Sequence, residues 1–283
     1  MSVHEVTSHG TPKASDLALG FRPGSQLGLA IAREVASYID TGAGRGLGLQ
    51  FVKHLSERSL VRYLSSLRQS AGRGHTAAGH LVQVRITVMR LYTTDRESIL
   101  IALNQIKKSL SGKALDILTK NAAIMDSSLD GVVSMDNLRR AFEVNVEAVH
   151  DATAACLPQL REGTQRKVFN LSSDVGSITL GRRLIDLPFP TYNIVKIALN
   201  ALTVQYALEF EKEGFTFFAV SPGWFRTNMV TDIADLDVST GASTELDVLS
   251  CLGAHINGKF LNVHVPGWEQ AEGLHQYDGG ELP

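Results

Sequence analysis

Cysteine is scarce in this sequence, and the usual metal-binding patterns are absent. Cys156 and Cys251 are the only cysteines, lie far apart and form no CxxC pair. Such spacing indicates neither a disulfide framework nor a zinc site, so both are expected to be core thiols in a reducing compartment. The nine histidines are scattered without ligand spacing, and no metal site is expected.

Long apolar runs and an excess of basic residues are also missing. No apolar run approaches the roughly 20 residues of a membrane span, and the N-terminus lacks the charged-then-apolar layout of a secretory signal. With 27 Lys and Arg against 29 Asp and Glu, the formal charge is -2, and the positive excess that binds phosphate backbones is lacking. We therefore expect a cytoplasmic protein that binds neither membranes nor nucleic acids.

The composition fits one large folded domain. Of the 283 residues, 44% are apolar and 20% are charged, as in soluble proteins that bury a sheet between two helix layers. From residue 35 to 264, short apolar runs alternate with amphipathic stretches, which is the rhythm of βαβ units. It predicts a single doubly wound, Rossmann-type α/β domain, with a mostly parallel seven-stranded sheet and helices on both faces. Residues 1–34 predict a poorly ordered extension, and residues 265–283 an irregular tail on the surface.

The apolar pattern places each expected element. Helices are expected where apolar residues recur at three- and four-residue spacing. The clearest lie at 46–57, 95–110, 136–158 and 192–212. Strands are expected at 36–40, 61–67, 83–91, 114–120, 167–172, 215–221 and 259–263.

A glycine-rich turn separates the first expected strand from the first expected helix. Residues 41–48 read TGAGRGLG, so Gly42, Gly46 and Gly48 follow the pattern GxxxGxG, with Leu47 where GxGxxG needs a small residue. In this context backbone N–H groups and the positive end of a helix can face a pyrophosphate. A plain glycine turn is the alternative, but the position between strand and helix favours a dinucleotide site.

The end of the second expected strand distinguishes the two nicotinamide cofactors. A carboxylate there would bind an adenosine ribose hydroxyl and repel a 2′-phosphate. Arg68 occupies this place instead, and Arg45 projects from the glycine turn. Two guanidinium groups are suited to a phosphate, so NADP(H) is favoured over NAD(H). The alternative is that Arg68 is a solvated residue at the end of a strand.

A tyrosine and a lysine stand one helical turn apart, after a strand that ends in serines. Tyr192 and Lys196 share one face of their expected helix. A phenol has a free pKa of about 10, so it needs a neighbouring cation such as Lys196 to act as an acid or base near neutral pH. Ser172 and Ser173 end an apolar strand, at the edge where open α/β sheets bind ligands. Together these residues predict an acid–base site.

These motifs resemble the short-chain dehydrogenase/reductase family, and most closely its carbonyl-reductase-like branch with the sniffer and C-factor proteins. The resemblance covers nearly all of 36–263. It implies the doubly wound fold, an NADP(H) cofactor and hydride transfer to or from a carbonyl or alcohol. The motifs that carry it, in the family's order, are the glycine turn, Asn121-Ala122, Asn145, Ser172-Ser173, Tyr192 with Lys196, and Ser221-Pro222-Gly223.

The resemblance also implies a role for each site residue. Tyr192 would exchange a proton with the substrate oxygen, and Asn145 would hold a water of the proton relay. Ser173 would bind that oxygen and is preferred over Ser172, because only one of two adjacent strand residues can face the cleft. Lys196 would bind the nicotinamide ribose and lower the pKa of Tyr192. The expected cofactor contacts are Gly42, Arg45, Gly46, Leu47, Gly48, Arg68, Asn121, Ala122, Tyr192, Lys196, Pro222, Gly223, Phe225 and Thr227, with 224–245 as a mobile lid over the substrate.

Several residues on the cofactor side depart from the family's pattern. Asp40 stands where the first strand is usually apolar, and a buried carboxylate must be neutralised or partnered unless its position is edge-exposed. Lys120 and Ala123 flank Asn121-Ala122 where Asn-Asn-Ala-Gly is usual, and Tyr92 replaces an Asp that usually meets the adenine ring. These changes weaken the expected cofactor affinity more than the expected catalysis.

The main hypothesis is an active NADP(H)-linked carbonyl reductase or alcohol dehydrogenase. The alternatives are a catalytically silent NADP(H)-binding or scaffold protein of the same fold, and a purely structural α/β domain. Apolar residues within 178–190 and 224–245 indicate a hydrophobic small-molecule substrate without identifying it. Family members are often dimers or tetramers, so a homo-oligomer is a further expectation.

Overall fold

The computed structural model describes residues 37–57, 62–67, 86–227, 234–251, 253–271 and 275–283. They belong to one compact unit, Val35–Pro283. The expected extension 1–34 and Arg68 lie outside the described residues. Within the described ranges, no helix has both the length and the apolar character needed to cross a bilayer.

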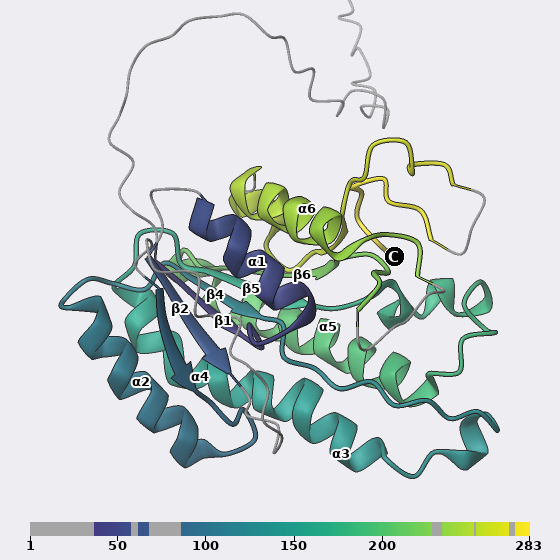
Figure 1. Cartoon of the computed structure of the whole chain (residues 1–283), viewed down its shortest axis with the longest axis horizontal. Helices are drawn as coiled ribbons and strands as arrows, with labels where there is room; N and C mark the ends of the chain where they lie inside the picture. The colour runs from purple at the N-terminus through teal and green to yellow at the C-terminus, as the bar shows by residue number, and fades with distance from the viewer. Residues whose placement is uncertain (1–36, 58–61, 68–85, 228–233, 252, 272–274) are drawn as a thin grey trace, which may run out of the picture. The chain divides into compact units, whose positions relative to one another are not determined.

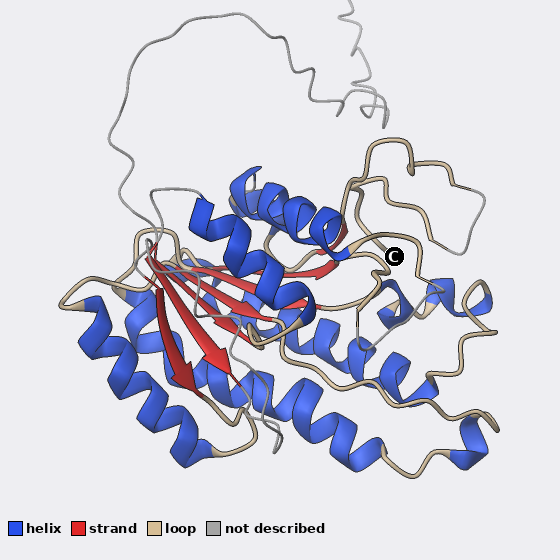
Figure 2. Ribbon diagram, in the orientation of Figure 1, coloured by secondary structure: helices blue, strands red, loops and turns tan. Residues whose placement is uncertain are grey.

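A parallel sheet runs through the centre of the domain (Figure 2). Its seven strands lie in the order β3-β2-β1-β4-β5-β6-β7, and each pairing of neighbours is parallel. The order reverses between β1 and β4, which is the switch point where open α/β sheets bind ligands. The expected doubly wound α/β class is therefore confirmed. The strands are β1 (Ser37–Thr41), β2 (Arg62–Leu67), β3 (Ile86–Arg90), β4 (Ile117–Lys120), β5 (Lys167–Leu171), β6 (Thr216–Ser221) and β7 (Phe260–Asn262).

Helices cover both faces of the sheet (Figure 1). On one face, α1 (Gly46–Glu57) packs beside α6 (Val238–Cys251). The other face carries α2 (Arg96–Leu110), α4 (Ala148–Arg161) and α5 (Pro190–Phe210). A short α3 (Leu138–Phe142) continues into α4 through one π-helical turn, η4 (Glu143–Glu147). The described 3-10 turns are η3 (Val132–Ser134), η5 (Asp174–Gly176), η6 (Thr179–Arg182), η7 (Glu211–Glu213) and η8 (Ala254–Ile256).

Alternating strand residues supply the two hydrophobic layers. On β6, Phe218 packs in the cluster shared with α1 and α6, and Phe217 packs in the cluster beneath α2, α4 and α5. On β5, Phe169 packs in the cluster shared with α1 and α6, and Val168 packs in the cluster beneath α2, α4 and α5. Successive strand side chains point to opposite faces, so a strand covered on both sides is mostly apolar. This requirement explains the short apolar runs by which the strands were predicted.

Most elements lie within a few residues of their expected bounds, but α6 was not predicted. Residues 224–245 were expected to form a lid, whereas α6 is part of the core, with Ala242 and Leu246 only 0% and 2% exposed. Its first turns are rich in Ser, Thr and Gly, which are poor helix formers, so packing rather than propensity stabilises it. Gly241 is required there, because a Cβ would lie 2.4 Å from Cζ of Phe225.

The described part of the C-terminal segment (residues 265–283) is irregular, as expected, and mostly exposed, but three of its residues are buried. Val265, His275 and Tyr277 are 5%, 4% and 1% exposed. Isolated antiparallel bridges join Leu261 to Glu281 and His264 to Asp278, so the segment folds back along β7. Its buried residues follow no helical or strand period, which is why the sequence did not predict this docking.

Asp40 is buried in β1 near Glu245 of α6. Because β1 lies between β2 and β4, the alternative of an edge-exposed Asp40 is excluded. Burial, and next the negative charge of Asp40, raise the pKa of Glu245 well above its usual value. Near neutral pH the folded chain therefore keeps a proton on Glu245 that the unfolded chain releases. As a result, the free energy of unfolding decreases as the pH rises above about 4.3, the pKa of a free glutamate.

Replacing Glu245 with Gln should stabilise the protein at neutral pH. The neutral amide has the size of the carboxyl group and needs no proton uptake, so we expect a gain of about 1–3 kcal/mol near pH 7 and little change near pH 4. Thermal unfolding across this pH range measures the effect. Glu162→Gln, at the exposed end of α4, serves as the control. A Glu245→Gln profile parallel to that of the original chain would contradict the raised pKa.

Candidate active site

The glycine turn after β1 lies against the residues directly after β4. Gly42 has a φ of +94°, and a Cβ there would lie 3.0 Å from N and Cα of Ala122. A Cβ at Gly48 would lie 2.3 Å from Nδ2 of Asn121 and 2.8 Å from the carbonyl oxygen of Gly42. Both positions require glycine, and the structure brings the turn and Asn121-Ala122 together as the motifs predicted.

The turn also places a helix N-terminus at the carboxyl edge of the sheet. Helix α1 begins at Gly46, and a Cβ there would lie 3.8 Å from the Thr227 methyl group. Arg45 is exposed beside it, and Leu47 is half-buried. A side-chain-free backbone at a helix N-terminus, with a guanidinium next to it, fits the pyrophosphate and phosphate groups of a dinucleotide.

Buried polar contacts fasten α5 to the end of β5. Nζ of Lys196 donates to the carbonyl oxygen of Leu171 at 2.6 Å. Oγ of Ser172 donates to Oδ1 of Asn200 at 2.6 Å, and Nδ2 of Asn200 donates to the carbonyl oxygen of Gly176 at 3.2 Å. These bonds hold the turn after β5 against the first turns of α5.

Tyr192 and Lys196 lie together, as their spacing predicted. Nζ of Lys196 is 5.2 Å from the centroid of the Tyr192 ring. Burial lowers the pKa of Lys196 to about 7. Burial is also the main cause that raises the pKa of Tyr192, and the charge of Asp174 is the second. The net shift of Tyr192 is thus upward, against the lowering expected from Lys196.

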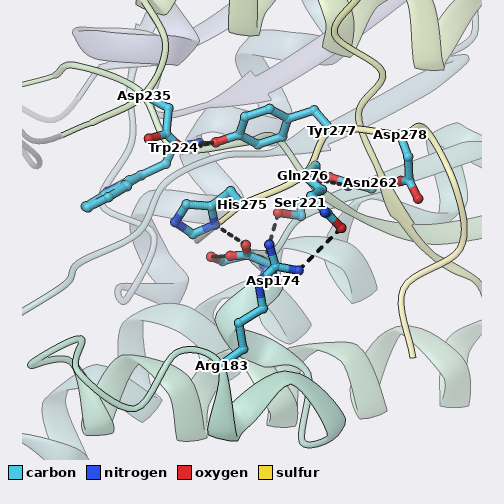
Figure 3. Close-up of polar contacts among 11 residues, drawn as sticks. Asp174, Arg183, Ser221, Trp224, Asp235, Asn262, His275, Gln276, Tyr277 and Asp278 are labelled. Atoms are coloured by element: carbon cyan, nitrogen blue, oxygen red, sulfur yellow. Dashed lines mark hydrogen bonds and ion pairs between the residues drawn. The ribbon is translucent and has the colours of Figure 1, made fainter. Parts of the chain in front are cut away.

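The two serines after β5 have different partners. Ser172 is buried and bonded to Asn200, whereas Ser173 is half-buried and its Oγ donates to Oδ1 of Asp174 at 3.2 Å. Asp174 also accepts a hydrogen bond from Nδ1 of His275 (Figure 3). Sequence reasoning missed both Asp174 and His275, because they lie 101 positions apart and no local pattern joins them.

Asn145 lies in the π-helical turn η4, on the side of α5 that carries Tyr192. Its Nδ2 donates to the carbonyl oxygens of Ala141 and Ile124 at 2.9 and 3.1 Å. Val146, the next residue, packs in a small cluster with Val195 and Tyr192. Oδ1 of Asn145 is buried and makes no hydrogen bond with any described residue. One acceptor is thus left for a further donor, as a relay through water requires.

The cofactor contacts expected in the segment after β6 differ in how far they are buried. Pro222 is buried, and Gly223 has a φ of +98° with the ring of Phe225 directly against it. Phe225 is 5% exposed, and its side chain belongs to the core cluster of α1 and α6. Thr227 is half-buried near Gly46.

The unusual residues after β4 and β3 are accommodated in different ways. Lys120 is buried and donates to Oγ1 of Thr153, and burial lowers its pKa to about 7. Burial raises the pKa of nearby Cys156 to about 12, although the charge of Lys120 opposes the shift. Tyr92 is 39% exposed after β3, and Asp95 caps the N-terminus of α2.

The chain is similar to known oxidoreductases in both sequence and structure. The sequence profile of the family described as short chain dehydrogenase matches residues 37–237. The short-chain dehydrogenase/reductase AacuF of Aspergillus aculeatus is 32% identical over 199 residues, covering 66% of this chain and 73% of that protein.

Solved structures show the same similarity. The NADPH-bound carbonyl reductase from chicken fatty liver has a TM-score of 0.74 and 27% identity, covering 81% of this chain and 92% of that chain. The carbonyl reductase Sniffer of D. melanogaster has a TM-score of 0.72 and 23% identity, covering 88% and 99%, and shows that the fold is shared.

Replacing Gly48 with Ala should weaken binding of the nicotinamide cofactor. The added Cβ would overlap Asn121 and the Gly42 carbonyl group, so the glycine turn must shift; we expect a loss of about tenfold or more in affinity, or at least about 1.4 kcal/mol. Calorimetric titration measures it, with circular dichroism to verify folding. Gly253→Ala is the control, because its Cβ would meet only Nδ1 of His255 at 3.6 Å. Unchanged affinity in a folded Gly48→Ala variant would contradict this placement of the turn.

Proposed function

Because the chain belongs to the short-chain dehydrogenase family, we propose that it is an NADP(H)-dependent oxidoreductase that moves hydride between nicotinamide and a carbonyl or alcohol group. The membership confirms the resemblance inferred from the motifs. The observation that carries the proposal is the grouping of Tyr192, Lys196 and the turn with Ser173 at the sheet edge that also holds the glycine turn. The similarity to an NADPH-bound carbonyl reductase supports both the cofactor and the reaction class.

Tyr192 is the proposed acid and base. In reduction its phenol gives a proton to the substrate oxygen as the carbonyl carbon gains hydride, and in oxidation the phenolate takes that proton back. Bound nicotinamide supplies or accepts the hydride. The proton must come from a positioned group, because hydride transfer without one would leave a strongly basic alkoxide.

Lys196 is the proposed cation beside the phenol. Its ammonium offsets the burial and the carboxylate that raise the pKa of Tyr192, and its position one turn along α5 also suits a ribose hydroxyl. Because burial lowers the pKa of Lys196 to about 7, this support is strongest below neutral pH and declines as pH rises.

Ser173 and Asn145 complete the proposed catalytic set. Ser173 is the serine of the pair whose hydroxyl is not committed to Asn200, so it is the one available to bind the substrate oxygen. Asn145 holds its side chain through two backbone carbonyl groups and keeps Oδ1 for a water that would return protons to the site.

The cofactor is assigned to the groove edge formed by the glycine turn. Gly42, Gly46 and Gly48 leave the backbone bare for the pyrophosphate, with Asn121-Ala122 against it. Arg45, together with Arg68, is proposed to bind the 2′-phosphate, which favours NADP(H). The remaining proposed contacts are Leu47, Pro222, Gly223 and Thr227, with the Phe225 backbone.

The proposed substrate is a hydrophobic carbonyl compound or alcohol. Leu180, Leu187, Phe189 and Trp224 are half-buried in the segments after β5 and β6, which supports an apolar pocket. A homo-oligomer stays a prediction, which size-exclusion chromatography with light scattering tests.

A catalytically silent NADP(H)-binding protein is the second candidate. It is favoured by the buried Lys120 and Asp40 close to the glycine turn, because buried charges there alter the site that must receive the cofactor. Tight NADPH binding without turnover across a broad carbonyl panel would favour this candidate. The absence of any nucleotide binding would reject both.

Replacing Tyr192 with Phe should abolish NADPH oxidation while leaving NADPH affinity within about twofold. The phenol hydroxyl donates the proton, so we expect kcat to fall by about 10²-fold or more. The measurement is NADPH absorbance with the most active carbonyl of the panel. The control is Tyr206→Phe, on the same helix but bonded to His150 at the outer surface. Turnover that survives in Tyr192→Phe would reject the assigned role.

Replacing Arg45 with Ala should reduce the preference for NADPH over NADH. Loss of a charge-assisted bond to the 2′-phosphate should raise the Kd for NADPH by about tenfold or more and leave that for NADH nearly unchanged. Arg139→Ala, an exposed arginine of α3, controls for the loss of one positive charge. Equal weakening of both nucleotides would contradict a phosphate contact.

A further inference from the structure

A histidine of the C-terminal segment reaches the carboxylate beside the proposed catalytic serine. Nδ1 of His275 donates to Oδ2 of Asp174, and Oγ of Ser173 donates to Oδ1 of the same carboxylate at 3.2 Å. The backbone N of Asp174 donates to Oγ of Ser221 at 2.9 Å, which fixes the residue between β5 and β6. Figure 3 shows the imidazole directed at this carboxylate. Asp174 therefore links Ser173 to a segment far along the chain.

The His275 ring is enclosed by aromatic side chains. It is 4% exposed, and its centroid lies 5.1 Å from that of Trp224 and 6.2 Å from that of Tyr277, which it stacks on at 8°. Tyr277 is held in turn, because its hydroxyl donates to Oδ2 of Asp235 at 2.8 Å. Nε2 of His275 is buried and makes no hydrogen bond with any described residue. A phenyl ring would fill this place without burying a polar nitrogen, so packing alone does not account for the histidine.

The charge of Asp174 acts on the proposed acid. After burial, it is the cause that raises the pKa of Tyr192, and it also contributes to the raised pKa of Tyr277. A hydrogen bond donated to a carboxylate stabilises its negative charge and weakens its effect on neighbours.

Further charged groups surround the pair. Asp235 reaches Tyr277, and Nη1 of Arg183 donates to Oε1 of Gln276, the residue after His275, at 3.4 Å. Lys196 faces Tyr192 from α5. Negative charge from Asp174 disfavours the phenolate, so it moves the ionisation of Tyr192 to higher pH.

We propose that His275 is a positioning residue of the reaction, which holds and partly neutralises Asp174 so that Ser173 stays oriented and Tyr192 ionises more readily. The proposal rests on the proposed oxidoreductase function. It makes the C-terminal segment part of the catalytic machinery rather than a cover for the sheet edge.

Point variants of the full chain separate this role from simple packing. His275→Phe keeps the ring between Trp224 and Tyr277 but removes the hydrogen bond, and His275→Asn keeps a donor near the Nδ1 position. Asp174→Asn removes the charge at constant size. The matched control is His264→Phe, because His264 pairs with Glu269 in the same part of the chain at 2.9 Å but is exposed.

The measured quantities are kcat and KM as functions of pH, with NADPH and a carbonyl substrate. His275→Phe should lower kcat about tenfold with the KM for NADPH unchanged, and move the alkaline limb of the kcat profile up by about half to one pH unit. Asp174→Asn should move that limb down. His275→Asn should restore most of the kcat. In the Asp174→Asn background, His275→Phe should cause no further shift.

Each other outcome overturns the proposal. Equal losses of activity in both His275 variants without a shift of the limb would mean a structural role only. Shifts of the same sign in His275→Phe and Asp174→Asn, or additive shifts in the double variant, would mean that His275 does not act through Asp174. The proposed oxidoreductase function would survive either result.

A measurement without turnover keeps the two proposals separate. In an alkaline titration, the tyrosinate absorbance of each protein minus that of its Tyr192→Phe counterpart reports the pKa of Tyr192. We expect this pKa to be lowest in Asp174→Asn, intermediate in the original chain and highest in His275→Phe. If the original chain lacks turnover, the oxidoreductase function fails, while this ordering still decides whether His275 acts on Tyr192; any other ordering rejects it.

Discussion

The buried ammonium of Lys196, bonded to the carbonyl oxygen of Leu171, fixes α5 on the carboxyl end of β5. Ser172 and Asn200 strengthen the same junction. Because α5 begins just before Tyr192, this junction determines where the phenol lies relative to Ser173. A salt bridge would fix the helix as well, but a carbonyl partner leaves the positive charge of the lysine uncompensated and therefore available to the phenol.

Burial makes this arrangement costly for each of its members. It raises the pKa of Tyr192 and lowers that of Lys196, so the uncharged form of both groups is favoured. Asp174 adds to the penalty on the phenolate, and its hydrogen bond with His275 limits that penalty. Groups with pKa values shifted by burial and by a specific charge, gathered in one site, are typical of active sites.

Features that depend on local period and spacing could be predicted from the sequence. The strand alternation of Phe217 and Phe218, the glycine turn and the spacing of Tyr192 and Lys196 are local in this sense, and the structure shows them as expected. Helix α6 and the C-terminal segment were not predicted, because tertiary packing rather than propensity determines their conformation. The contact of Asp174 with His275 joins distant positions, so no window of the sequence contains it.

Two departures from the family pattern, Asp40 and Lys120, bring buried ionisable groups close to the glycine turn. Burial and the charge of Asp40 raise the pKa of Glu245, so stability is lost as pH rises above about 4.3. Burial lowers the pKa of Lys120 to about 7, so its cost to stability is full below about pH 7 and disappears only as pH rises toward the free lysine value of about 10.4. Around neutral pH both groups therefore oppose folding. Packing alone explains neither Glu245 nor Lys120, because apolar side chains would fill the same space. Lys120 is the last residue of β4, and Glu245 lies near Asp40 of β1. Both destabilising groups therefore lie close to the place where the glycine turn meets Asn121. Local conflicts of this kind are typical of functional sites, and their position agrees with the cofactor site proposed from the turn itself.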